Sequence, residues 1–292
     1  MHSKLHIRPT TPDRHGRILH VTPELAGWKC VGFDVYRLQP SQTISEVNVD
    51  REICAVVITG TAVIRANGTL LANTRHRRSP FDPETWALYA PIGASWEIEA
   101  MTPLEIAICS APASTAKTPR LIRPNEVVRQ ERGTGANKRF VYDLLPEDED
   151  IADSLLVLEA ITPPGSWSSY PPHKHDRDDL PWESSLEEVY YYRIKPSSGF
   201  AVQRIYTEDK SIDETISVND GQVVLVPYGY HPVGAPHGYE LYYLNVMAGP
   251  KRIWRTRIDP DHAWILSGTS ESPEANSSTN HSSRGSEGIA CT

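Results

Sequence analysis

The second half of the chain contains four residues whose types and spacing suit a metal ion. His173 and His175 stand two residues apart in PPHKHD, and on a strand this spacing directs both imidazoles to one face. Glu188 begins the aromatic run EVYYYR, where a buried carboxylate must be paired or bound to a cation. His231 follows the turn PYGY that ends the apolar run VVLV. This donor set suits Zn first, and also Mn, Fe, Co or Ni, with open positions for water or substrate.

The sequence offers more than one histidine and more than one glutamate as metal ligands. The HxH pair alone could lie on a solvated loop, and only the carboxylate and histidine that follow strengthen the metal interpretation. His237 stands six residues after His231 and competes with it as a ligand, with a substrate contact or a structural role as alternatives. Glu188 is favoured as the acidic ligand over Glu187, which would face the other side of the strand, and over Glu183 in the preceding loop.

The elements that position these residues are expected to be strands. With 24 Pro and 18 Gly and few apolar residues at helical spacing, the chain is typical of an all-β sandwich or barrel. The first half has candidate strands at Trp28–Leu38, Glu52–Thr59, Thr61–Ala66, Trp86–Tyr89, Ser95–Ala100 and Leu104–Ser110. The second half has candidates at Phe140–Leu144, Ser154–Thr162, Val189–Ile194, Ala201–Thr207, Gln222–Val226 and Tyr239–Val246.

The segment APASTAKTPRLIRPNEVVRQERGTGANKR separates the two strand-dense regions and is polar and rich in Pro and Gly. It indicates an interdomain crossover with a boundary near Arg120. We expect an N-terminal barrel over residues 1–120 and a C-terminal metal-binding barrel over 121–266. Residues 267–292 are Ser-rich and almost free of large apolar groups, so they cannot offset their ordering entropy and are predicted to be a disordered tail.

The two halves resemble each other, which predicts an internal duplication. REICAVVITGTAVI in the first half is similar to LEEVYYYRI in the second, and a Pro-x-Gly turn follows each. In this alignment Glu52 falls on Glu188 and Ser95 falls on His231. A lone Glu and a Ser cannot hold a metal, so the first barrel is expected to serve packing or oligomerisation.

Composition excludes several classes of function. The net charge of -8 comes from 29 basic and 37 acidic residues without a basic stripe, so a nucleic-acid partner is not expected. The longest apolar runs are far below the roughly 18 residues of a membrane span, and the charged N-terminus lacks a secretory core. Four cysteines show no CxxC spacing, and disulfides are not predicted. We expect a cytoplasmic protein that forms a homo-oligomer.

Three stretches carry a family resemblance: WSSYPPHKHD, LEEVYYYRI and GYHPVGAPHGYELYYLNVMAGP. They resemble the 5-deoxy-glucuronate isomerase family of inositol catabolism, in the cupin superfamily that also includes 4-deoxy-L-threo-5-hexosulose-uronate ketol-isomerase. The resemblance extends to about Leu266. It implies a bicupin, two jelly-roll-like barrels in tandem, with one metal in the C-terminal barrel. The usual cupin spacing places Glu three or four residues after HxH, whereas DRDDLPWESSLE precedes Glu188 here.

The resemblance implies conversion of 5-deoxy-D-glucuronate into 5-dehydro-2-deoxy-D-gluconate. In such an aldose–ketose isomerisation, a Lewis-acidic metal stabilises the negative charge that develops on the two reacting oxygens. A base must also remove the carbon-bound proton. The candidates are Glu183, Glu187, a metal-bound hydroxide, and Tyr190 as a proton relay.

A cation inside the barrel is expected to bind the carboxylate of the substrate. Arg204 in AVQRIYT is favoured over Lys174, which should point away from its flanking histidines, although Arg204 could equally form an exterior salt bridge. Tyr192 shares the inward face with Tyr190 and could line the pocket, and His237 is a further candidate contact. Two other functions remain open: a metal-dependent dioxygenase on the same fold, and a non-enzymatic sugar-acid-binding or storage-type bicupin.

Overall fold

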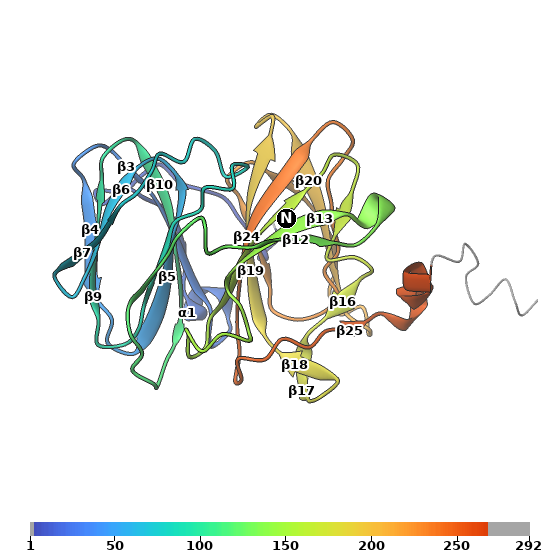
Figure 1. The fold of residues 1–292 in the computed structure, drawn as a ribbon. Helices are drawn as coiled ribbons and strands as arrows, with labels where there is room; N and C mark the ends of the chain where they lie inside the picture. Colours follow the sequence, from blue (N-terminus) through green and yellow to red (C-terminus); the bar gives the residue numbers. More distant parts are fainter. Residues whose placement is uncertain (1–2, 268–292) are drawn as a thin grey trace, which may run out of the picture.

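The computed structural model describes residues 3–267, which form a nearly all-β protein of two units side by side (Figure 1). The helical elements in this range are short, namely α1 (Pro23–Ala26), η1 (Gly135–Asn137) and η2 (Pro260–Ser267). The prediction of an all-β fold is confirmed. The disordered tail predicted for residues 267–292 lies outside the described residues, apart from its first position. No helix of the described range has the length and apolarity to cross a bilayer.

The N-terminal unit is a sandwich of two antiparallel sheets. Its apolar core lies between them and includes Ile64, Leu88 and Ile106. The six-stranded sheet has the order β11 (Arg120–Ile122), β8 (Ala87–Ala90), β5 (Arg51–Thr59), β10 (Leu104–Pro112), β3 (Gly32–Leu38) and β2 (Arg17–Val21). The four-stranded sheet has the order β4 (Thr43–Val47), β9 (Ser95–Ala100), β6 (Ala62–Ala66) and β7 (Thr69–Asn73).

The C-terminal unit has the same kind of sandwich and a core of its own. That core includes three tyrosines, Tyr190, Tyr192 and Tyr243. The seven-stranded sheet has the order β1 (His6–Ile7), β22 (Val223–Val226), β19 (Glu187–Lys195), β24 (Glu240–Ala248), β14 (Leu156–Thr162), β13 (Arg139–Leu145) and β12 (Arg129–Arg132). The four-stranded sheet has the order β15 (Trp167–Ser168), β23 (Val233–Gly234), β20 (Phe200–Tyr206) and β21 (Asp213–Asn219).

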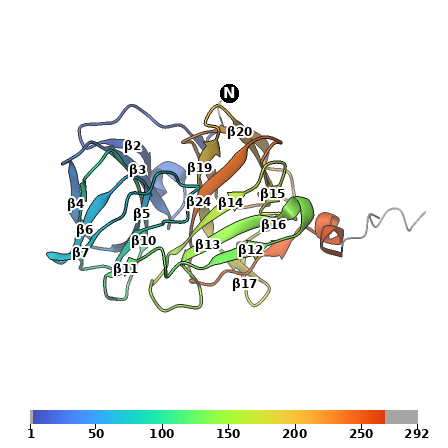
Figure 2. The same cartoon turned by 45° about the horizontal axis from the view of Figure 1, so that its top comes forward.

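Segments far apart in sequence complete the C-terminal unit. The first strand of the chain, β1, pairs with β22, so the N-terminus lies on the second unit (Figure 2). Two short ladders extend beyond the main sheets. They pair β16 (His173–Lys174) with β25 (Arg257–Ile258), and β17 (Asp176–Asp179) with β18 (Glu183–Ser185).

Strand order is the same in the two units. The order β8-β5-β10-β3-β2 in the first corresponds to β22-β19-β24-β14-β13 in the second, and β4-β9-β6-β7 corresponds to β15-β23-β20-β21. Ile53 pairs with Ala90 directly before Pro91, and Glu188 pairs with Val226 directly before Pro227. By this register Ile53 corresponds to Glu188, so the alignment of Glu52 with Glu188 is wrong by one residue. The residue that corresponds to Glu52 is Glu187.

The two large sheets pack face to face, and these two glutamates cross the interface in opposite directions. The carboxylate of Glu52 accepts hydrogen bonds from three successive backbone N–H groups of residues 153–155, at 2.6–2.8 Å. Glu187 does the same for residues 29–31, at 2.7–2.9 Å. Each tripeptide directly precedes a sheet strand. Its N–H groups donate to a glutamate carboxylate and not to a neighbouring strand. The strands predicted to begin at Trp28 and at Ser154 therefore begin four and two residues later, at β3 and β14.

These reciprocal contacts should make a measurable contribution to stability. Replacing Glu52 by Ala leaves three backbone donors without their acceptor, and we expect the free energy of unfolding to fall by about 2–4 kcal/mol. Glu187→Ala should act in the same direction. Urea denaturation at fixed metal concentration measures both, with the exposed Glu131→Ala as a control. Unfolding curves of both variants that superimpose on the wild type would contradict the assignment.

Candidate metal centre

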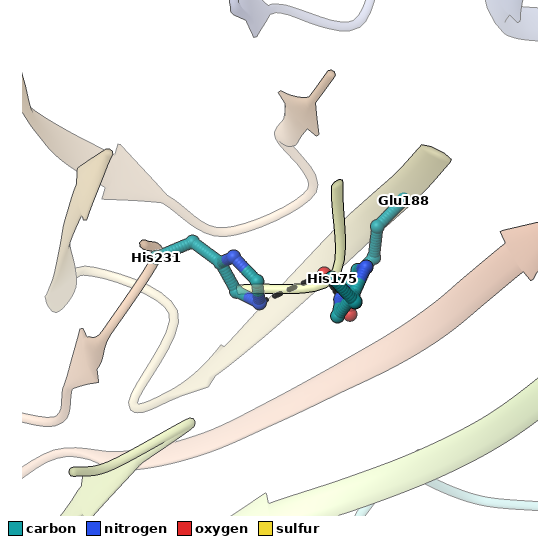
Figure 3. A group of neighbouring side chains, drawn as sticks. All are labelled: His175, Glu188 and His231. Carbon is teal, nitrogen blue, oxygen red and sulfur yellow. Dashed lines mark hydrogen bonds and ion pairs between the residues drawn. The ribbon is translucent and has the colours of Figure 1, made fainter. Parts of the chain in front are cut away.

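Three buried side chains of the C-terminal unit converge on one point (Figure 3). His175 follows β16, Glu188 lies in β19, and His231 lies between β22 and β23. Glu188 Oε2 lies 3.1 Å from Nε2 of His175 and 3.1 Å from Nε2 of His231. One donor atom from each residue falls within 4.8 Å of the others. Three of the four predicted ligands are therefore brought together.

Strand alternation explains why Glu188 enters the barrel. Along β19, Glu188, Tyr190 and Tyr192 share one face, and the last two belong to the core of the C-terminal unit. Val189 and Tyr191 point to the other face and belong to the apolar layer between the two units. The run EVYYYR is buried on both faces, which is why its sequence is apolar and aromatic without alternation.

Backbone carbonyls fix the orientation of two imidazoles. His175 Nδ1 lies 3.2 Å from the carbonyl oxygen of Leu186, and His231 Nδ1 lies 2.8 Å from that of Gly229. A carbonyl can only accept, so each Nδ1 donates its proton, and Nε2 is the nitrogen of each ring that faces Glu188. This outer contact is the usual way in which proteins orient a metal-binding histidine.

The local charges keep Glu188 ionised. Burial by itself would raise the pKa of this carboxyl, but His231 and His175 hold it well below its usual range. Burial opposes a charge on His175, and the Glu188 carboxylate outweighs it, so the pKa of His175 is raised. Asn245 on β24 donates from Nδ2 to Glu188 Oε1 at 2.5 Å and so fixes the second carboxylate oxygen.

The residues present fit a divalent cation. His231 Nε2 is buried and makes no hydrogen bond within residues 3–267, although Glu188 Oε2 lies 3.1 Å away. An unsatisfied buried nitrogen is costly, and a cation held with the neighbouring carboxylate would satisfy it. Imidazole and carboxylate together are ligands of Zn and of the other transition metals.

The fourth predicted ligand, His173, stands beside this group. Its ring centroid lies 5.0 Å from that of His231 and 6.3 Å from that of His175. Burial, with the neighbouring histidines, lowers the pKa of His173 well below its ordinary value, so its imidazole is neutral and free to bind a cation. Unlike the other three residues, it is only half-buried, and together with Glu188 it lines a cavity.

Glu183 and Lys174 belong to a different cluster, which corrects their predicted roles as base and substrate contact. Lys174 Nζ lies 2.9 Å from Glu183 Oε1, and the backbone N–H groups of Asp176 and Arg177 donate to the same oxygen. Both side chains are buried. They bind each other and do not line the cavity beside Glu188. Glu187, the other proposed base, is also corrected, because its carboxylate is bound at the interface between the units.

The other three predicted substrate contacts also lie outside the lining of this cavity. Arg204 forms a bidentate pair with Asp213 on the adjacent strand, at 2.9 and 3.0 Å, so the exterior salt bridge is the correct alternative for it. His237 is exposed in a turn. Tyr192 is buried in the barrel, where its hydroxyl donates to Gln203 Oε1 at 2.7 Å. Tyr192 is therefore a core residue behind the site.

Glu188, His173 and Tyr190 line a cavity of about 460 Å³, a volume typical of small-molecule sites. Its wall also contains residues that the sequence did not single out: Arg139, Ser169, Tyr243, Asn245, Trp254 and Ile265. Arg139 falls in the polar stretch interpreted as a crossover, which in fact contributes β12, η1 and the start of β13. Asn245, a lone amide in the apolar run LYYLNVMA, was the one clear sequence signal among them.

Two tyrosines bring hydroxyl groups to this cavity. Tyr190 Oη lies 2.9 Å from Ser169 Oγ, and Tyr243 Oη lies 2.5 Å from Ser168 Oγ. Burial, and then the charge of Glu188, raises the pKa of Tyr190 well above its ordinary value. The phenol therefore stays protonated near neutral pH and acts as a donor.

Comparison with known proteins identifies the family. The model of the KduI/IolB family matches residues 5–265. The chain belongs to this family. It is 49% identical over 265 residues to the 5-deoxy-glucuronate isomerase of Geobacillus thermodenitrificans, covering 90% of this chain and 96% of that protein. The Bacillus subtilis enzyme of the same name is 43% identical over 252 residues, covering 86% and 93%.

Solved structures agree with this KduI/IolB membership. An IolB-like protein from Salmonella typhimurium LT2 matches with a TM-score of 0.86 at 43% identity, covering 90% of this chain and 99% of that one. Oxalate decarboxylase from Lactobacillus farciminis matches with a TM-score of 0.64 at 13% identity, covering 95% and 97%, which shows a cupin-like fold and nothing of activity. The predicted resemblance to an isomerase family is confirmed, and it favours an isomerase over the dioxygenase and binding-protein alternatives.

Metal content should depend on the three convergent residues. We expect His175→Ala and Glu188→Gln to bind less than a tenth of the metal that the wild type retains after dialysis, measured by plasma mass spectrometry. Removing a ligand both weakens chelation and leaves a buried polar group unpaired. His237→Ala is the matched control, because its side chain is exposed in a turn. If His237→Ala lost its metal while His175→Ala and Glu188→Gln kept theirs, the assignment of the metal ligands would be wrong.

Metal affinity should also depend on pH through His175. A cation needs the neutral imidazole, and the pKa of His175 is raised above 6.5, so protons compete with metal already near neutrality. Below that raised pKa, we expect the dissociation constant for Zn²⁺ to rise by up to about tenfold per pH unit. Competition with a chromogenic chelator between pH 5.5 and 8.5 measures this. An affinity that stays constant over this range would exclude His175 as a ligand.

Proposed function

We propose that this KduI/IolB protein converts 5-deoxy-D-glucuronate into 5-dehydro-2-deoxy-D-gluconate with the help of one divalent metal, of which zinc is the first expectation. The observation that carries the proposal is the convergence of His175, Glu188 and His231 at a small-molecule cavity. The relatives named 5-deoxy-glucuronate isomerase supply the substrate class.

Four side chains are proposed to hold the metal: His175, Glu188 and His231, with His173 as the fourth. When bound, the metal supplies Lewis-acid polarisation of the substrate oxygens that gain negative charge. Asn245 keeps the Glu188 carboxylate in place, and the carbonyls behind His175 and His231 maintain their tautomers.

Proton transfer is proposed to involve Tyr190. The reaction removes a proton from the carbon next to the aldehyde and returns one to the aldehyde carbon, while a hydroxyl proton moves between the two oxygens. The protonated hydroxyl of Tyr190, hydrogen-bonded to Ser169, can donate to a substrate oxygen and relay that proton. Within the described cavity wall Glu188 is the acidic residue, and it is proposed to bind the metal. A metal held by His173, His175, Glu188 and His231 would supply the basic chemistry at the carbon by acidifying water.

The two units are proposed to descend from one duplicated cupin barrel, in which the second copy alone kept its metal donors. Their matching strand order supports this proposal. In the first unit the strand position of Glu188 is occupied by the buried Ile53, which cannot bind a cation. A cytoplasmic location and assembly into a homo-oligomer remain predictions from the sequence.

Turnover of 5-deoxy-D-glucuronate tests the proposal directly. We expect the purified protein to form the ketose, dialysis against a chelator to abolish turnover, and one equivalent of a divalent metal to restore it. His175→Ala should remain inactive after metal is added back, while His237→Ala should match the wild type. Absence of turnover with Zn, Mn, Fe, Co and Ni would reject the substrate assignment. Turnover that survives complete metal removal would reject the role of the metal.

A further inference from the structure

We propose that Arg139 binds the carboxylate of the sugar acid and so sets which end of the substrate faces the metal centre. This inference rests on the proposed function for the identity of the substrate. It replaces the sequence expectation that Arg204 has this role.

Arg139 begins β13 at the wall of the cavity that Glu188 and His173 also line. Its Nη1 contacts the carbonyl oxygen of Asn137 at 3.2 Å and that of Tyr170, weakly, at 3.5 Å. Within residues 3–267 it forms no ion pair with a carboxylate. An arginine in a cavity wall with only carbonyl contacts can still form a bidentate pair with an incoming carboxylate.

The other cations near the site are already neutralised. Arg132, which lines the same cavity, lies 3.1 Å from Asp143 and beside the ring of Trp254. Lys174 is held by Glu183, and Arg204 by Asp213. Arg139 is thus the cavity arginine whose charge has no acidic partner in the described chain.

Arg139 shares its cavity with the residues beside the metal centre. Its side chain lines the same cavity wall as those of His173 and Tyr243. Tyr243 in turn packs against Tyr190, with ring centroids 5.0 Å apart. Arg139 therefore belongs to the same compact site as the proposed proton relay.

The two ends of the substrate need different binding groups in the cavity. In 5-deoxy-D-glucuronate the aldehyde and the carboxylate lie at opposite ends of a six-carbon chain. The carboxylate of the substrate could itself bind the metal and so displace the aldehyde end. The ionised Glu188 carboxylate opposes this, because the two negative charges repel each other. An arginine in the cavity wall binds the acid end and leaves the carbonyl end for the metal and for Tyr190.

Kinetics of metal-loaded variants test the assignment. We expect Arg139→Met to raise KM for 5-deoxy-D-glucuronate by about 10- to 100-fold with a smaller change in kcat, since a charge-assisted bidentate contact is lost. Arg139→Lys should lie between Arg139→Met and the wild type. Arg204→Met, whose charge is held by Asp213 on the outer face, is the control and should keep the wild-type KM. Metal content and circular dichroism check that each variant is folded and loaded.

A neutral substrate and a binding measurement separate the roles. For 5-deoxy-D-glucose, in which a hydroxymethyl group replaces the carboxylate, Arg139→Met and wild type should have equal kcat/KM. Calorimetry of D-glucuronate binding measures the contribution of Arg139 independently of turnover. The dissociation constant of Arg139→Met should be at least about tenfold higher than that of the wild type. If the wild type shows no turnover but still binds D-glucuronate more tightly than Arg139→Met, the proposed reaction is rejected and the carboxylate-binding role of Arg139 is supported. Equal binding, or no binding by the wild type, would overturn the assignment.

Discussion

The carboxylate of Glu188 is a negative charge buried at the centre of a β-barrel, and the surrounding structure compensates for it. An isolated ion in this position would cost several kcal/mol or would take up a proton. Two imidazoles approach one oxygen and the amide of Asn245 binds the other, so the charge persists in a largely apolar core. The same arrangement that stabilises the carboxylate also creates a ligand set for a cation.

Strand geometry lets two adjacent glutamates serve unrelated purposes. Glu188 points into the barrel, while Glu187 points to the opposite face and binds the backbone before β3. A shift of one residue in the register of β19 would exchange them and destroy both the site and the interface. The contact of Glu52 with residues 153–155 is the counterpart of the Glu187 contact, so the interface between the units holds β19 in place from outside the barrel.

The cavity beside the metal centre is formed in part by a segment whose sequence shows no strand pattern. The polar stretch before Phe140 looks like a linker, because its charged and glycine residues lack a strand pattern. In the structure β12 pairs with β13 along the edge of the seven-stranded sheet, which places Arg139 at the cavity. The candidate metal centre and the arginine proposed to bind the substrate therefore lie on different strands of the same sheet, Glu188 on β19 and Arg139 on β13.

The sequence by itself determined the β class, most of the long strands and the three residues that converge at the candidate metal centre. These features are local: buried strands have apolar runs, and the HxH pair, Glu188 and His231 lie at strand ends where their side chains must turn inward. Only the tertiary structure decided the roles of Glu183, Glu187 and Arg204, because each is set by a partner distant in sequence or on a neighbouring strand. Arg139 and Asn245 likewise joined the site only through strand pairing, which brings together residues whose separation along the chain carries no signal.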